Sequence, residues 1–163
     1  MAKNNFGIKS LLNNYSFKDF IKDIIIPLII SGLLTMVSMC VVKDSFGLLS
    51  DVVDLALEII PALFALLLTA YLFLLTFFQA DKLHNLLSSQ EGKELYLQLN
   101  SSFALCILVS VIALALSLVV YFVLKLDCFC IYADVINYGT IFILSLFLGF
   151  LVKIQFDIVI DLY

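Results

Sequence analysis

The chain has 163 residues, of which 64% are apolar and 13% charged, and its net charge is −4. Soluble domains contain about 45–50% apolar and about 25% charged residues, so this composition excludes an ordinary soluble fold. All nine basic residues are lysines, and without arginine the chain lacks the planar fork that recognises phosphate and guanine, so direct nucleic-acid binding is not expected.

Four apolar stretches are long enough to cross a bilayer, at about 24–42, 59–78, 102–124 and 135–152. A helix needs about 20 residues to cross a hydrocarbon core of about 30 Å. The pattern predicts an all-α membrane protein in which four transmembrane helices form a bundle and a single domain, 1–163. Little sequence remains for a soluble domain, and no catalytic, cofactor-binding or metal-ligand pattern is found. We therefore expect no enzyme activity, cofactor or metal.

The N-terminal segment 1–23 carries an amphipathic pattern ahead of the first span. Ser16 and Asp19 have the spacing of a helix cap, and apolar residues repeat on one helical face from Phe17 to Ile25. The pattern predicts an interfacial helix that leads into the first span. A role in sensing lipid or a partner is the alternative.

Lysines flank the spans unevenly. Seven lie before the first span, between the second and third, or after the fourth, whereas Lys43 and Lys125 flank the opposite side. Because positively charged loops stay in the cytoplasm, we expect both termini and residues 79–101 to be cytoplasmic, and residues 43–58 and 125–134 to lie outside. The expected location is a bacterial cytoplasmic (inner) membrane.

Three acidic residues, Asp51, Asp54 and Glu58, share one helical face at the outer end of the second span. If the span begins near residue 59, Glu58 lies at the outer interface, where water reaches it. If the span begins near Val52, Asp54 and Glu58 lie inside the membrane and form a sensor or ion site, because ionisable groups at that depth are usually functional.

Residues 79–101 predict a cytoplasmic helical hairpin, because the second and third helices continue into it without a breaker. Ser88 to Glu91 fits a helix cap, so the turn is expected near Gly92 or just before Ser88. Apolar residues here would lie above the lipid, packed within the hairpin or against a cytosolic protein or another subunit. The candidate partner-binding residues are Leu83, Leu87, Lys93, Leu95, Tyr96 and Leu99.

Small residues follow one face of each span. In the third span they are Ser102, Cys106, Ser110, Ala113 and Ser117. Helices in lipid are held together by close backbone approach, so this face predicts packing in a bundle and in a homo-oligomer, with Val109 facing lipid. Similar faces are formed by Ser31, Thr35 and Ser38, by Ala62, Ala65, Thr69 and Thr76, and by Ser145 and Gly149. A pore lined by Ser110 and Ser117 is the alternative.

Lys153 and Asp157 interrupt the apolar pattern after the fourth span. Their spacing of four residues predicts an ion pair on the helix surface at the inner interface. A buried pair in a transport path is the alternative.

The overall layout resembles the KwaA family, the small membrane components of the Kiwa system of bacterial anti-phage defence. The resemblance covers the whole chain: four spans with short loops, both ends inside, and a hairpin reading LHNLLSSQEGKELYLQLNSSF. It implies a membrane-resident oligomer that senses infection at the envelope and works with a cytosolic effector.

Two functions follow from these features. The first is an oligomeric sensor or scaffold that contacts membrane lipid and recruits or controls a cytosolic effector through its hairpin. The second is a small oligomeric ion channel or membrane-permeabilising protein. Polar groups within the spans are mostly single hydroxyls, such as those of Thr69, Ser110 and Ser145, rather than a continuous path. We therefore favour the first function.

Overall fold

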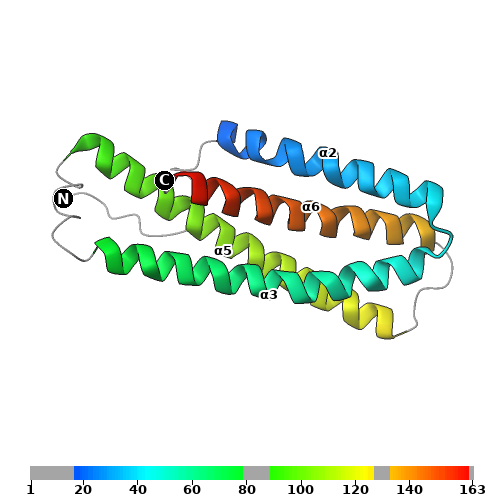
Figure 1. Cartoon of the computed structure of the whole chain (residues 1–163). Coiled ribbons are helices and arrows are strands. Elements are labelled where there is room, and N and C mark those ends of the chain that lie inside the picture. Colours follow the sequence, from blue (N-terminus) through cyan, green and yellow to red (C-terminus); the bar gives the residue numbers. More distant parts are fainter. Residues whose placement is uncertain (1–16, 79–88, 127–132, 162–163) are drawn as a thin grey trace, which may run out of the picture.

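The computed structural model describes residues 17–78, 89–126 and 133–161, which form four long helices (Figure 1). These are α2 (Phe17–Val41), α3 (Ser45–Phe78), α5 (Gln90–Lys125) and α6 (Ala133–Asp161). No strand occurs among the described residues. Each helix is long and apolar enough to cross a membrane. The predicted all-α class is confirmed, and the four candidate spans support a multi-pass membrane protein.

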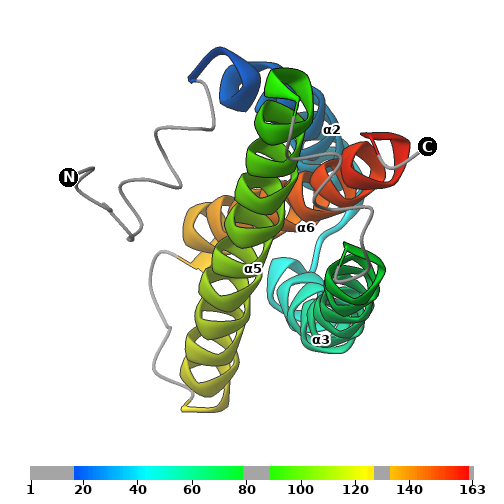
Figure 2. The same ribbon diagram turned by 90° about the vertical axis from the view of Figure 1, so that its left-hand side faces the viewer.

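α6 is the central helix of the arrangement. It contacts α2, α3 and α5, and α3 also contacts α5. Figures 1 and 2 show α2 and α3 on opposite sides of α6. α2 therefore packs mainly on α6, and much of its apolar surface stays exposed, as in Leu33, Met36 and Val37. Such a surface suits contact with lipid.

Two groups of buried side chains hold the helices together. The larger joins α3, α5 and α6, and consists of Ala56, Ile60, Leu67, Leu99, Phe103, Cys106, Val109, Ala113, Phe150, Leu151, Ile154 and Ile158. The smaller joins the start of α3 to α6, and consists of Leu49, Val53, Tyr138, Ile141 and Leu144. α3 thus meets α6 along most of the length of α6.

α3 and α6 run in the same direction and keep one register along their contact. Asn137 Nδ2 donates to Ser45 Oγ at 3.1 Å, and Gln155 Nε2 donates to the carbonyl oxygen of Leu63 at 3.0 Å. The partners are 92 residues apart in both pairs. Ser45 Oγ also donates to the carboxylate of Asp134, so the start of α3 is tied to the start of α6.

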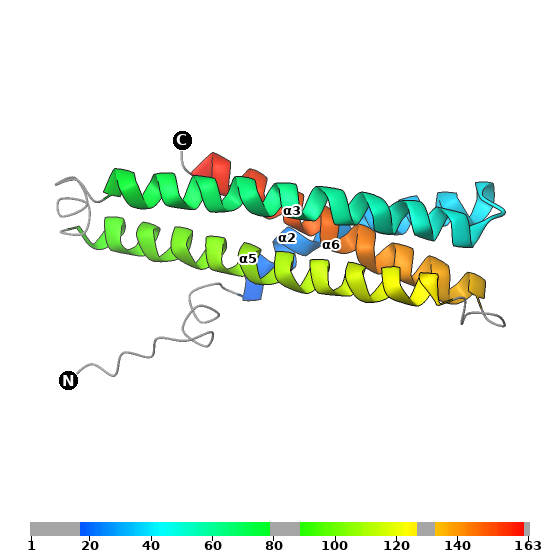
Figure 3. The same ribbon diagram turned by 90° about the horizontal axis from the view of Figure 1, so that it is seen from below.

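α3 and α5 are longer than a span requires. With 34 and 36 residues, they extend for about 51 and 54 Å at a rise of about 1.5 Å per residue. Figures 1 and 3 show that the end of α3 and the start of α5 project past the adjacent ends of α2 and α6, and Figure 1 shows that they diverge beyond the contact of Tyr71 with Asn100. We call residues 70–78 and 89–101 the α3–α5 end.

Several predicted boundaries differ from the structure. Residues 17–23 form the first turns of α2, so the described residues contain no separate interfacial helix; residues 1–16 lie outside them. α3 begins at Ser45, ahead of the predicted span start at residue 59 and of the alternative start near Val52. The Asp44 carboxylate accepts a hydrogen bond from the backbone N–H of Gly47 at 2.9 Å, which is N-cap geometry.

The cap of α5 is one residue later than predicted. Ser89 Oγ accepts a hydrogen bond from the backbone N–H of Gly92 at 3.1 Å, which is the usual N-cap geometry. Gly92 therefore lies in the first turn of α5, and the predicted turn at Gly92 is wrong. The alternative turn, just before Ser88, falls outside the described residues.

Candidate functional site

The α3–α5 end carries part of the predicted partner-binding set. Lys93 is exposed and Tyr96 is half-buried on α5. Leu83 and Leu87 lie outside the described residues, and for Leu95 only the backbone is described. These five predictions therefore stay predictions.

Leu99 does not belong to that surface. It is only 4% exposed and packs in the core between α3, α5 and α6. The prediction that Leu99 is a surface anchor is wrong, because its side chain follows the buried face of Phe103 and Cys106, four and seven residues on. Leu97, which the sequence analysis did not select, is 48% exposed on the other side of α5. Leu97 lies on the opposite side of α5 from Ser102 and Cys106, so the helical spacing from these small residues would have predicted its exposure.

The α3–α5 end also exposes apolar groups of α3. Leu72 is 60% exposed and Phe73 71% exposed. Tyr71 and Asn100 hold the two helices together at the base, with Tyr71 OH donating to Asn100 Oδ1 at 2.9 Å. The two helices of the α3–α5 end are therefore joined at its base, and each exposes apolar or charged groups beyond that contact.

The predicted packing face of α5 lies inside the protomer. Cys106, Ala113 and Ser117 are 0% exposed, Ser110 is 1% exposed, and Ser102 is half-buried. The hydroxyls of Ser110 and Ser117 donate to the carbonyl oxygens of Cys106 and Ala113, at 2.8 and 2.9 Å, in their own helix. This face packs α5 against α3 and α6, and its hydroxyls are satisfied there. Val109, predicted to face lipid, is 9% exposed and belongs to the same core.

The small residues of α3 face outward instead. Ala62, Ala65, Thr69 and Thr76 are all exposed. Thr69 Oγ1 donates to the carbonyl oxygen of Ala65 at 2.8 Å, so its hydroxyl is satisfied within the helix. The predicted packing of this face inside the bundle of one protomer is not observed.

The acidic residues of α3 lie at the level of the fourth span. The constant offset between α3 and α6 places the predicted span 135–152 beside residues 43–60. Asp51, Asp54 and Glu58 are exposed within that stretch. If the fourth span lies in the bilayer, these carboxylates lie at membrane depth, where they need water or another protein surface. They also share one face of α3 with Ala62, Ala65 and Thr69.

The small residues of α2 and α6 make a close contact between these helices. Ser31 is 1% exposed and Thr35 7% exposed. On α6, a Cβ atom added at Gly149 would lie 3.3 Å from Cβ of the buried Pro27. The predicted packing of these two small-residue faces is confirmed within the protomer.

Replacing Gly149 with leucine is expected to separate α2 from α6. The added side chain has no room beside Pro27, and overpacking of this kind costs about 1–3 kcal/mol. Thermal unfolding in detergent should show a lower midpoint for Gly149→Leu. Gly139, on the same helix, has nothing within 4 Å of an added Cβ atom, so Gly139→Leu should not lower the midpoint. Equal midpoints for the two variants would contradict the close contact.

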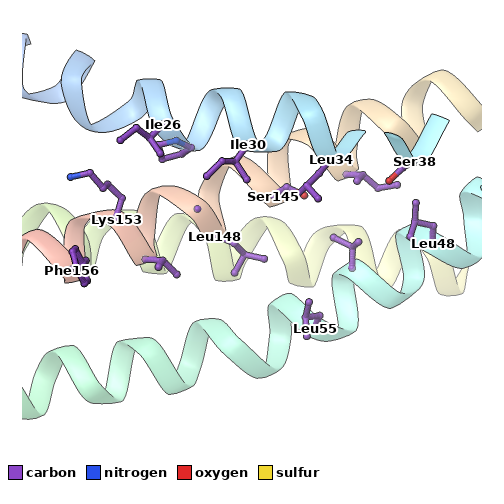
Figure 4. A pocket seen from close by; sticks show the side chains of 15 residues that line it. Ile26, Ile30, Leu34, Ser38, Leu48, Leu55, Ser145, Leu148, Lys153 and Phe156 are labelled. Atoms are coloured by element: carbon purple, nitrogen blue, oxygen red, sulfur yellow. The ribbon is translucent and has the colours of Figure 1, made fainter. Parts of the chain in front are cut away.

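A groove runs along α6 between α2 and α3 (Figure 4). Its volume is about 640 Å³. Its lining comes from three helices: Ile26, Pro27, Ile30, Leu34 and Ser38 of α2, Leu48, Val52 and Leu55 of α3, and Ile141, Ser145, Leu148, Gly149, Val152, Lys153 and Phe156 of α6. Apart from Ser38, Ser145 and Lys153, every lining side chain is apolar.

Lys153 lies at one end of the groove and connects α6 to α2. Its ammonium group pairs with the carboxylate of Asp157 one turn later, as predicted, and Nζ lies 3.8 Å from Asp23 Oδ1. The three side chains are 22%, 32% and 16% exposed, respectively. The contact with Asp23 was not predicted, although both residues were expected at the inner ends of their spans.

No protein-family model, curated protein or solved structure matches the chain.

Proposed function

We propose that the protein is an oligomeric membrane sensor and scaffold whose α3–α5 end recruits or controls a cytosolic effector. The observation that carries this proposal is the projection of the paired helices past α2 and α6 (Figure 3). A helix that only crosses the bilayer needs about 20 residues. The extra length of α3 and α5 builds a rigid platform beyond the ends of the other two helices.

The surface of that platform suits a protein partner. Leu72, Phe73 and Leu97 expose apolar area, and Lys93 and Glu94 are exposed on the same end of the molecule. In protein interfaces a few buried apolar anchors carry most of the binding energy, whereas charges around them set orientation and association rate. Outside lipid, such apolar side chains are stabilised by a partner that covers them.

The resemblance to the KwaA family supports a role in anti-phage defence at a bacterial inner membrane. In this proposal the membrane-embedded helices respond to a disturbance of the envelope, and the α3–α5 end passes the signal to the effector. This requires the α3–α5 end and both termini to face the cytoplasm.

Cysteine labelling tests this orientation. In a variant without native cysteines, Lys93→Cys should be protected from an impermeant maleimide in intact cells, whereas Lys43→Cys should react. Both lysines are exposed. Lys93 lies in the first turn of α5 and Lys43 between α2 and α3, and these two segments lie at opposite ends of the molecule (Figure 1), so the variants form a matched pair. Labelling of Lys93→Cys in intact cells would place the α3–α5 end outside and overturn the proposal.

Self-association is proposed to use the exposed face of α3. Small residues allow helices in lipid to approach closely, and Ala62, Ala65 and Thr69 supply such a face on α3. Ala65→Leu should therefore reduce the particle mass in mild detergent, measured by light scattering. Ala115, an exposed alanine of α5, provides the control, since Ala115→Leu should leave the mass unchanged. An unchanged mass for both variants would exclude this interface.

An ion channel is the second candidate, because the same face of α3 has the residues of a cation path. Asp51, Asp54 and Glu58 stand at one end and Ala62, Ala65 and Thr69 continue it. A ring of α3 helices would bring the carboxylates together around a central axis. Purified protein that conducts cations in liposomes, with conductance lowered by Glu58→Gln, would favour this function over the scaffold.

A further inference from the structure

We propose that the groove between α2 and α3 binds an acyl chain of a membrane phospholipid that has a zwitterionic, amine-bearing headgroup, with that headgroup beside Lys153 (Figure 4). This inference is independent of the proposed scaffold function. It rests on the size of the groove, its lining and the charges at one end.

The dimensions fit a single chain. The volume of about 640 Å³ lies within the range of about 300–1,000 Å³ that is typical of small-molecule sites. Along α6 the groove runs from Ile141 to Phe156, which at a rise of about 1.5 Å per residue is about 22 Å. One leaflet contributes about half of a hydrocarbon core of about 30 Å. The groove therefore holds a chain from one leaflet together with the glycerol region.

The lining selects hydrocarbon over water. Its walls are mostly aliphatic with one aromatic residue, Phe156, and the only polar lining side chains away from Lys153 are Ser38 and Ser145. A column of water would find too few hydrogen-bond partners along such walls. The walls are also made of large side chains, such as Ile30 and Leu34, which are 50% and 56% exposed. Close approach of a helix from a second copy favours small residues instead.

The charges at the inner end favour a headgroup with both signs. Lys153 contacts Asp157 and Asp23, and Lys22 is exposed next to Asp23. A phosphate would approach the ammonium of Lys153, while the amine of the headgroup would approach the two carboxylates. Lys153 is already paired with the two carboxylates, so a headgroup that is only anionic would bring its phosphate close to them without an amine of its own to offset the repulsion. Phosphatidylethanolamine therefore fits this end better than phosphatidylglycerol.

Tryptophan fluorescence tests the proposal, because the chain contains no tryptophan. Ile30→Trp places a fluorophore in the groove wall, and Ile29→Trp places one on the adjacent surface, which does not line the groove. The two isoleucines are 50% and 55% exposed, so they differ mainly in the direction they face. Each variant is reconstituted with phosphatidylethanolamine or phosphatidylglycerol that carries brominated chains, which quench nearby tryptophan.

At Ile30→Trp, brominated phosphatidylethanolamine should bind about threefold more strongly than phosphatidylglycerol, the effect of an ion pair that is partly exposed to solvent. At Ile29→Trp the two lipids should quench equally. The double variant Asp23→Asn with Asp157→Asn should remove the preference at Ile30→Trp. Equal quenching by both lipids at Ile30→Trp, or no quenching there, would overturn the proposal.

A second measurement avoids a bulky probe in the groove. In native mass spectrometry, the unaltered protein should retain phosphatidylethanolamine at one molecule per protomer after detergent exchange. Ser145→Phe, which fills the groove, should lose it, whereas Ile143→Phe, at a residue of α6 that is 44% exposed outside the groove, should keep it. Equal lipid retention by these two variants would also overturn the proposal.

Discussion

Replacing Ala113 with leucine is expected to lower the free energy of unfolding by about 3 kcal/mol, the upper end of the usual cost of overpacking a core. Ala113 is 0% exposed, and its side chain lies in the core that joins α5 to α3 and α6. Added methyl groups would push these helices apart at the centre of the protomer. The measurement is reversible unfolding in mixed micelles by titration with a denaturing detergent.

The control is Ala115→Leu, two residues further along α5 at an exposed position. It adds the same side chain to the same helix, and its stability should match that of the unaltered protein. A comparison with Ala65→Leu separates folding from assembly: Ala113→Leu should destabilise the protomer, whereas Ala65→Leu should change only the particle mass. A stable Ala113→Leu variant would show that α5 does not pack as described.

Replacing both Phe73 and Leu97 with alanine is expected to abolish recruitment of the cytosolic partner. The two side chains are 71% and 48% exposed on the α3–α5 end, so their removal leaves the core of the protomer intact. Truncation of a central interface anchor commonly costs about 2 kcal/mol or more. Two such losses weaken binding by about 1,000-fold. Co-purification of the partner in mild detergent, together with protection against phage, should fall below detection.

A matched pair at the opposite end of α5 controls for general effects of lost apolar surface. Phe122 and Leu118 are 63% and 42% exposed, and alanine at both should leave co-purification and protection intact. The free energy of unfolding and the particle mass should be unchanged for both double variants. If cells with the Phe73 and Leu97 double variant keep full protection against phage while the purified protein conducts cations, the scaffold function is wrong and the channel function is favoured.

Local sequence patterns predicted those features that depend on one helix or on a short spacing. Four apolar runs gave four long helices, and the uninterrupted sequence before the third run predicted that its helix begins well ahead of the span. The close contact between the faces of Ser31 and Gly149 followed from residue size, because small side chains are needed where helices approach. The pair of Lys153 with Asp157 followed from helical spacing.

Features that depend on the alignment of two helices were not predicted. The apolar run of α3 suggested a span at 59–78. In the structure, hydrogen bonds between α3 and α6 align the two helices so that Asp51 and Glu58 lie beside the fourth span. The contact of Asp23 with Lys153 has the same origin. Residue size alone also did not distinguish the buried face of Ala113 from the exposed face of Ala65, since small residues on either face allow close packing of helices.

Site-specific crosslinking in living cells tests the scaffold function most directly. A photoreactive amino acid at position 97 is placed on the α3–α5 end, and the same residue at position 122 is the control on the other end of α5. If the α3–α5 end recruits an effector, position 97 crosslinks to a discrete soluble protein, Phe73→Ala removes this product, and position 122 does not form it. Crosslinks from position 97 only to lipid or to other copies of the chain would contradict the scaffold function.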